Sequence, residues 1–138
     1  MKEHILAACK LLSEIYTDRT YADRVFDGEN ASALSVRLVF GVLERDTEIS
    51  FILAQLAEKR PQKPVRILLK VGAYALLYLD NVPDYAIVSE CVEAVRSMGK
   101  GGASGFVNAV LKRIAARRFS LPEPGAPDYL SVHYSKPE

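Results

Sequence analysis

The chain has 138 residues, of which 49% are hydrophobic and 25% are charged, and its net charge is +1. These values are typical of a single globular domain. No apolar run approaches the roughly 20 residues that a membrane span requires. Charges inside the apolar pattern of the first residues exclude a secretory signal. Both cysteines, Cys9 and Cys91, lie in apolar helical patterns, so we expect reduced, structural thiols in a cytoplasmic protein.

Basic residues are concentrated in two segments of the chain. Residues 59–79 contain five lysines or arginines, residues 96–122 contain six, and neither segment contains an acid. Segregation of this kind favours a phosphate-bearing partner that binds on one side of the molecule. A solvated basic face is the other interpretation of the same pattern.

Apolar residues recur at three- and four-residue steps along most of the chain, which predicts helices at residues 3–16, 31–45, 48–59 and 65–79. Asp46 or Thr47 is placed to cap the third of these helices. Gly41 inside the second indicates close approach by another helix, because glycine in a helix otherwise costs up to about 1 kcal/mol. The fourth is apolar almost all round, so we expect it to be the central helix.

Residues 82–114 predict two further helices joined by a glycine-rich corner. Pro83 suits a helix start, and Gly99, Gly101 and Gly102 permit a tight reversal. The second of the two helices has one apolar face and carries basic residues elsewhere. No strand pattern and no internal repeat is visible. The sequence therefore predicts an all-α bundle of six or seven helices.

Candidate sites are few. His4 and His133 lie at opposite ends of the chain, so neither a catalytic constellation nor a metal-ligand spacing is present. The corner at residues 99–105 predicts a plain helix–helix turn, with a backbone contact to phosphate as the second interpretation. Asn108 is expected to hydrogen-bond a neighbouring helix terminus, or alternatively to contact RNA. Phe106 is expected in the core, with base stacking as the functional alternative.

The sequence GFVNAVLKRI at residues 105–114, preceded by LYLDNVPDYAIVSECVEAV at residues 77–95, resembles the NusB-like fold family. Within it, the chain is more similar to the N-terminal domain of RsmB-type (Sun or Fmu) 16S rRNA cytosine-C5 methyltransferases. The segment LVFGVLER at residues 38–45 looks like the "yGVLR" segment of that group. The ending YLSVHYSKPE resembles its short segment before the methyltransferase domain.

The antitermination NusB proteins are the other branch of the resemblance, and they bind a boxA RNA and a ribosomal protein. They typically start with an arginine-rich helix, whereas this chain starts with MKEHILAACK. Their last-helix motif tends toward KFVNGVLD, which also differs from the sequence here. Both departures favour the methyltransferase branch.

The resemblance implies a NusB-like RNA-binding domain at residues 1–119 and a linker at residues 120–138 toward a C-terminal methyltransferase domain that this chain lacks. The implied partners are 16S rRNA, that catalytic domain and a ribosomal protein; S-adenosylmethionine would bind the absent domain. We expect no catalytic residue, metal or cofactor in this chain. A stand-alone antitermination protein and a protein-docking helical module remain alternatives. Clustering of the two basic segments would favour RNA, and a contiguous apolar patch would favour docking. The residues expected to contact RNA are Lys59, Arg60, Lys63, Arg66, Lys70, Lys100, Phe106, Asn108, Lys112, Arg113, Arg117 and Arg118.

Overall fold

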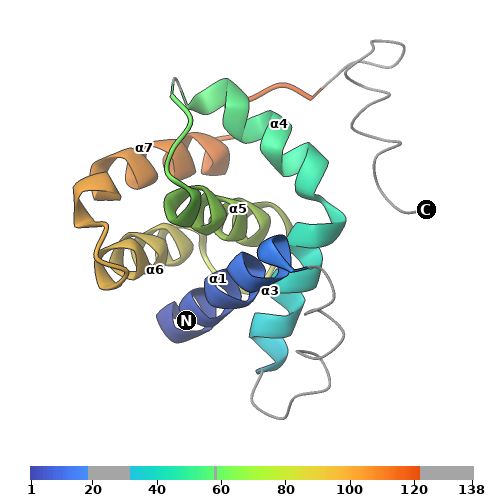
Figure 1. Ribbon diagram of the computed structural model, residues 1–138. Helices are drawn as coiled ribbons and strands as arrows, with labels where there is room; N and C mark the ends of the chain where they lie inside the picture. The colour runs from blue at the N-terminus through green and yellow to red at the C-terminus, as the bar shows by residue number, and fades with distance from the viewer. Residues whose placement is uncertain (19–31, 58, 122–138) are drawn as a thin grey trace.

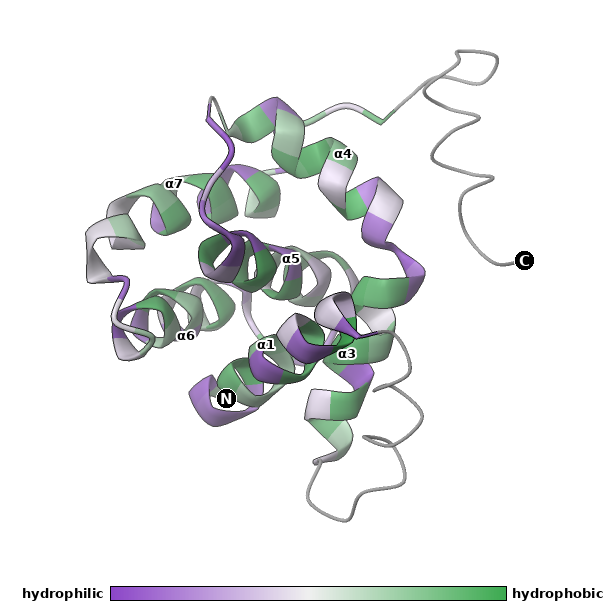
Figure 2. Cartoon of the chain, in the orientation of Figure 1, coloured by the Kyte–Doolittle hydropathy of each residue, from purple (hydrophilic) through white to green (hydrophobic). Residues whose placement is uncertain are grey.

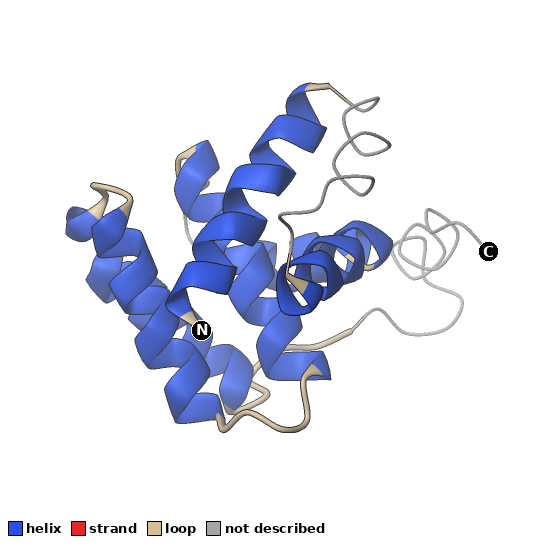
Figure 3. Cartoon of the chain, turned by 90° about the horizontal axis from the view of Figure 1, so that it is seen from below, coloured by secondary structure: helices blue, strands red, loops and turns tan. Residues whose placement is uncertain are grey.

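A computed structural model describes residues 1–18, 32–57 and 59–121 of the chain. Six α-helices and one 3₁₀ turn make up the regular structure of these residues, and no strand occurs among them (Figure 3). The predicted all-α bundle is confirmed. No helix in the described part is long and apolar enough to cross a membrane. The elements are α1 (Lys2–Thr17), α3 (Ala33–Glu44), α4 (Asp46–Leu56), α5 (Lys63–Tyr78), α6 (Asp84–Ser97), η1 (Gly101–Ala103) and α7 (Ser104–Ala115).

Helix α5 is the centre of the bundle, as its apolar sequence predicts. It contacts α1, α3, α4, α6 and α7, and lies between them in Figure 1. Ten of its sixteen residues are buried, which places an almost continuous apolar surface away from water. The apolar faces of the surrounding helices turn toward it (Figure 2).

Two glycines allow the helices to approach α5 closely. A Cβ atom on Gly41 of α3 would overlap the aromatic ring of Tyr74 on α5. A Cβ on Gly72 of α5 would lie 2.9 Å from a methyl carbon of Leu111 and 3.1 Å from the Cys91 sulfur. The close approach predicted at Gly41 is therefore confirmed, and Tyr74 is the residue that occupies the space.

The first four helices start one or two residues away from the predicted positions 3, 31, 48 and 65, and two of these differences concern helix caps. Helix α3 begins at Ala33 and is capped by Ser32, whose hydroxyl oxygen accepts a hydrogen bond from the backbone N–H of Ser35. Asp46 does not cap α4, because it is already the first residue of that helix. Its carboxylate instead accepts a hydrogen bond from Lys70 on α5 at 2.7 Å.

The chain after α7 runs back against α4. The Gln55 side-chain amide donates to the carbonyl oxygen of Ser120 at 2.6 Å, and its oxygen accepts from the Ser120 N–H at 3.0 Å. Phe119 packs, partly buried, against the core. These contacts hold residues 117–121, which we call the C-terminal strap, along α4. The predicted linker beyond residue 121 lies outside the described residues.

Candidate nucleic-acid interface

The two basic segments meet at a cavity formed by the α4–α5 loop and the α6–α7 corner. The cavity has a volume of about 480 Å³. Lys59 and Arg60 come from the loop, Lys100 comes from the corner, and Phe106 comes from the first turns of α7. No acidic residue of the described chain lines this cavity. We call it the basic cavity; its loop and corner are among the hydrophilic segments in Figure 2.

The backbone of the corner fixes the position of Lys100. Gly99 has a φ of +77°, its N–H donates to the carbonyl of Arg96, and the N–H of Lys100 donates to the carbonyl of Val95. This pattern is a Schellman motif, in which glycine supplies the left-handed residue after the helix. The sequence predicted the reversal, and Gly99 is the glycine with positive φ among the described residues.

The other corner glycines are not required by packing. A Cβ atom on Gly102 or Gly105 would meet nothing within 4 Å, and neither residue has a positive φ. Gly102 lines the basic cavity. Its missing side chain leaves the backbone there open to a ligand, which is the condition for a backbone contact to phosphate.

The side chains of Lys59, Arg60 and Lys100 make no hydrogen bond or ion pair to other described residues. Their charges are therefore available to a ligand. Phe106 is half-buried and packs against the core while it also lines the cavity. Phe106 therefore packs against the core as expected, and base stacking stays a prediction.

A second cavity of about 400 Å³ lies on the other side of the α4–α5 loop, between α4 and α5. Lys59 and Arg60 line it too, together with Arg66 and Lys70. Arg66 donates to the carbonyl of Pro61 at 2.9 Å. The Lys70 ammonium is paired with Asp46, lies 4.7 Å above the ring centre of Tyr16 and is only 12% exposed. Lys70 therefore joins α1, α4 and α5, and its charge is already compensated.

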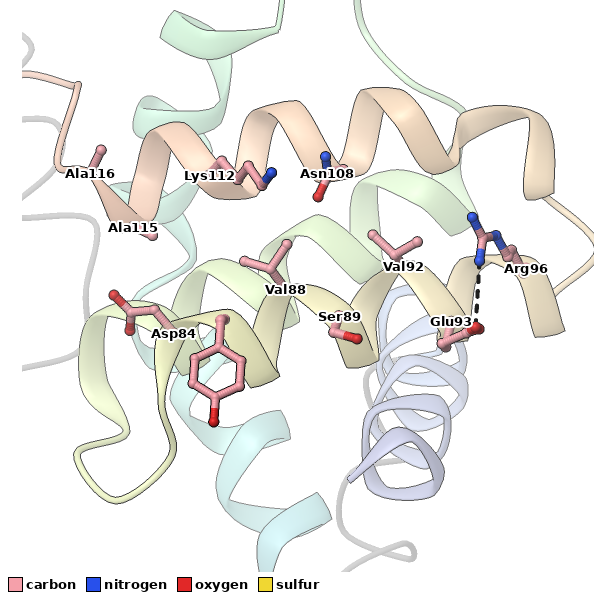
Figure 4. Close-up of a pocket in the computed structure, with 11 residues that line it drawn as sticks. Asp84, Val88, Ser89, Val92, Glu93, Arg96, Asn108, Lys112, Ala115 and Ala116 are labelled. Carbon is pink, nitrogen blue, oxygen red and sulfur yellow. Dashed lines mark hydrogen bonds and ion pairs between the residues drawn. The ribbon is translucent and has the colours of Figure 1, made fainter.

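Asn108 and Lys112 lie in a different place, the groove of about 670 Å³ between α6 and α7. Figure 4 shows Asn108 and Lys112 on α7, across the groove from Val88 and Val92 of α6. The groove also contains Asp84 and an ion pair of 3.5 Å between Arg96 and Glu93, so its charges are mixed. Asn108 makes no hydrogen bond to a helix terminus in the described chain, so that structural prediction is wrong.

The last predicted residues lie near the end of α7. Arg113 donates to the carbonyl of Leu56 at the end of α4 at 3.3 Å. Arg117 has a φ of +59° and donates to the carbonyls of Ile114 and Ala115, so its guanidinium caps its own helix. Arg118 is exposed and follows it. These three residues are not part of the basic cavity.

Lys63, at the start of α5, lines a smaller groove of about 230 Å³ with Lys10 and Ser13 of α1. Its ammonium lies 3.4 Å from the Thr17 hydroxyl. Lys10 is a cation of this groove that the sequence does not single out, because it is an isolated basic residue on the polar side of an amphipathic helix.

The described residues offer no reactive centre. No group of three potential metal ligands occurs among them. Cys9 and Cys91 are both free and buried. Burial raises the pKa of the Cys9 thiol to about 12 and raises that of Cys91 as well. Protonated, enclosed thiols are poor nucleophiles, so both cysteines are part of the core.

The sequence was compared with protein families and with known proteins, and both comparisons found relatives. A family model described as the NusB family matches residues 5–116. The chain is 36% identical over 84 residues to a probable ribosomal RNA small subunit methyltransferase B of Bacillus subtilis, an alignment that covers 59% of this chain but only 19% of that protein.

Two similar proteins are transcription antitermination proteins NusB. The one from Bacillus velezensis is 31% identical over 96 residues, which covers 67% of this chain and 74% of the relative. The one from Syntrophomonas wolfei is 26% identical over 123 residues, which covers 80% of this chain and 92% of the relative. The helical bundle, the matched residues 5–116 and these similarities together show that the chain belongs to the NusB family.

Proposed function

We propose that this chain is an RNA-binding domain whose basic cavity holds the sugar–phosphate backbone of the bound strand. The observation that carries the proposal is the convergence of Lys59 and Arg60 with Lys100 around Phe106, with no carboxylate among the described residues that line the cavity. Lysine and arginine release counterions when they neutralise phosphates, and an exposed aromatic edge offers a surface on which a base stacks.

Binding by these groups is expected to be weak and salt-sensitive. Contacts to phosphate position a strand but carry no information about its sequence. The mixed charges around Asn108 and Lys112 add less attraction for a polyanion than the cavity does, because Asp84 and Glu93 lie beside them. Selectivity for a particular RNA must then come from base contacts or from an attached domain.

The remaining predicted contacts divide into two groups under this proposal. Lys63, Lys112 and Arg118 are exposed and extend the positive surface outside the cavity. Lys70, Arg113 and Arg117 are held by bonds within the protein, so we assign their main contribution to the fold. Arg66 has one N–H engaged with Pro61 and keeps further donors for a ligand.

The proposal is tested by measuring the affinity of a 16S rRNA fragment for the variant K59Q/R60Q/K100Q. The control is R37Q, which removes one exposed charge from α3, away from the cavity, and shows what a single surface charge contributes. We expect the triple variant to lose about tenfold in affinity, because three phosphate contacts of about 0.5 kcal/mol each sum to about 1.5 kcal/mol. Equal affinity of the triple variant and R37Q would overturn the proposal.

Within this function, we propose that the domain positions 16S rRNA for an attached S-adenosylmethionine-dependent methyltransferase domain, with residues 120–138 as the connection. Support comes from the similarity to the Bacillus subtilis methyltransferase and from the segment at residues 38–45. The cofactor and the methylation chemistry would belong to that attached domain. The chain described here would supply binding and orientation.

Transcription antitermination is the second candidate function. The specific observation in its favour is the Syntrophomonas wolfei protein, which the alignment covers over 92% of its length. Affinities for 16S rRNA fragments and for boxA RNA, measured side by side, separate the two. Preference for boxA, with a ribosomal protein bound at the same time, would support antitermination. Preference for an rRNA fragment would support the methyltransferase role.

A further inference from the structure

The cavity between α4 and α5 combines an apolar interior with a positive rim. Its apolar wall is formed by residues of α4, α5 and the loop, and its rim is formed by lysines and arginines. No acidic residue of the described chain lines it. We call it the α4–α5 groove. The apolar residues are Leu53, Ala54, Ala57, Pro61 and Leu69, and the cations are Lys59, Arg60, Arg66 and Lys70; the charge of Lys70 is compensated by Asp46, so the first three make the rim positive.

Two of the rim cations are held in place before any ligand binds. The Arg66 guanidinium donates to the carbonyl of Pro61 at 2.9 Å. The Lys70 ammonium is fixed by Asp46 at 2.7 Å. A guanidinium whose plane is fixed loses little entropy when a flat ligand stacks on it. The volume of about 400 Å³ also falls within the roughly 300–1,000 Å³ that is usual for ligand pockets.

The α4–α5 groove and the basic cavity are adjacent. Lys59, Arg60 and Pro61 line both of them, so these residues form a ridge between two hollows, neither of which is lined by an acid from the part of the chain that the structure describes. An RNA strand whose phosphates lie in the basic cavity can cross this ridge while its backbone stays next to cationic side chains. Its next base then lies at the mouth of the α4–α5 groove.

We infer that the α4–α5 groove takes an unpaired nucleobase of an RNA strand whose phosphates occupy the basic cavity. This inference rests on the proposed function. A nucleobase has two flat, largely apolar faces, which suit the wall of Leu53 and Leu69, and arginine guanidinium planes are common stacking partners for splayed bases. A base in a duplex cannot enter the groove, so the domain distinguishes single-stranded from double-stranded RNA there.

The test fills the groove without changing its charge. Ala54 is exposed on α4 and lines the groove, so the variant Ala54→Phe occupies it, and Ala7→Phe on the exposed side of α1 is the matched control. The probe is a mixed-sequence single-stranded RNA of about 12 nucleotides. We expect Ala54→Phe to lose about tenfold in affinity, as for one stacked base, with unchanged circular dichroism. A duplex of the same sequence should bind both variants equally. Equal affinity of the two variants for the single strand would overturn the inference.

Photocrosslinking locates the base independently of any substitution. RNA that carries 4-thiouridine should crosslink to residues 50–57 or 66–70 of the unaltered chain, which include lining residues of the α4–α5 groove and none of the basic cavity. Crosslinks confined to other segments would overturn the inference. Adenosine monophosphate is the comparison ligand: if it binds the groove, and Ala54→Phe abolishes that binding but not RNA binding, the groove is a free-nucleotide site and the inference is wrong.

Failure of this inference can be told from failure of the proposed function. If K59Q/R60Q/K100Q loses affinity for RNA while Ala54→Phe does not, the basic cavity binds RNA and the groove does not take a base. If the unaltered chain binds neither the single strand nor the rRNA fragment, both proposals fall together.

Discussion

Replacement of Gly41 by alanine is the sharpest test of the packing around α5. The new Cβ would overlap the Tyr74 ring, and the ring cannot simply move away because Tyr74 is 9% exposed and stacks against Tyr78 with ring centres 5.3 Å apart. Overpacking of this kind costs about 1–3 kcal/mol, and expelling the ring would cost about as much in lost burial. The higher helix propensity of alanine over glycine offsets at most about 1 kcal/mol of this cost.

We therefore expect Gly41→Ala to lower the free energy of unfolding by about 2 kcal/mol, measured by chemical denaturation. The matched control is Gly105→Ala on α7, whose Cβ would meet nothing within 4 Å; it should leave stability unchanged or raise it by up to about 1 kcal/mol. A double-mutant cycle with Tyr74→Leu should show strong coupling, because the smaller side chain frees the space. A neutral or stabilising Gly41→Ala would refute the assigned contact.

Three further outcomes follow from the contacts. Lys70→Met should destabilise the fold by about 1 kcal/mol, because Asp46 loses its ion-pair partner but keeps the hydrogen bond from the Tyr16 hydroxyl. A stable preparation should keep most of its RNA affinity, because Asp46 already compensates the Lys70 charge; a large loss of affinity would show that RNA uses this charge in spite of the pairing. Burial raises the pKa of Cys9 from 9.0 to about 12, and burial with the bond to Glu48 raises that of Tyr78 from 10.0 to about 12. The unfolded chain therefore releases protons that the folded state retains, and stability should fall as the pH rises from about 9 to about 12; denaturation curves that coincide at pH 8 and pH 11 would contradict this. Gln55→Ala removes both bonds to Ser120, so limited proteolysis should cut the C-terminal strap faster while Gln62→Ala, another exposed glutamine change, leaves the rate unaltered.

The fold was largely predictable because its helices carry regular apolar spacing. The central position of α5 and the close approach at Gly41 followed from composition and propensity alone. The start of α3 did not, since the cap at Ser32 lies beside a polar segment with no periodicity. The exact first and last residues of a helix depend on single capping hydrogen bonds, and a pattern of apolar residues does not specify those bonds.

The candidate site was predictable as a charge pattern but not as a geometry. The sequence gives Lys59 and Lys70 the same charge in the same segment. The structure leaves Lys59 exposed and pairs Lys70 with Asp46, a residue 24 positions away. In the sequence, Arg117 is one more unpaired cation; in the structure, its guanidinium donates to the carbonyl of Ile114 and caps α7. Hydrogen-bond and ion-pair partners, whether distant as for Lys70 or local as for Arg117, decide which charges a ligand can use, and apolar periodicity carries no information about them.

The central claim is that the basic cavity binds phosphates, and the salt dependence of RNA affinity tests it most directly. For single strands, each cation that neutralises a phosphate contributes a slope of about −0.7 to the plot of log affinity against log salt. We predict that K59Q/R60Q/K100Q has a slope smaller in magnitude by about 2 than the unaltered chain, whereas R37Q leaves the slope unchanged. A triple variant with the same slope as the unaltered chain would show that RNA phosphates do not bind in this cavity.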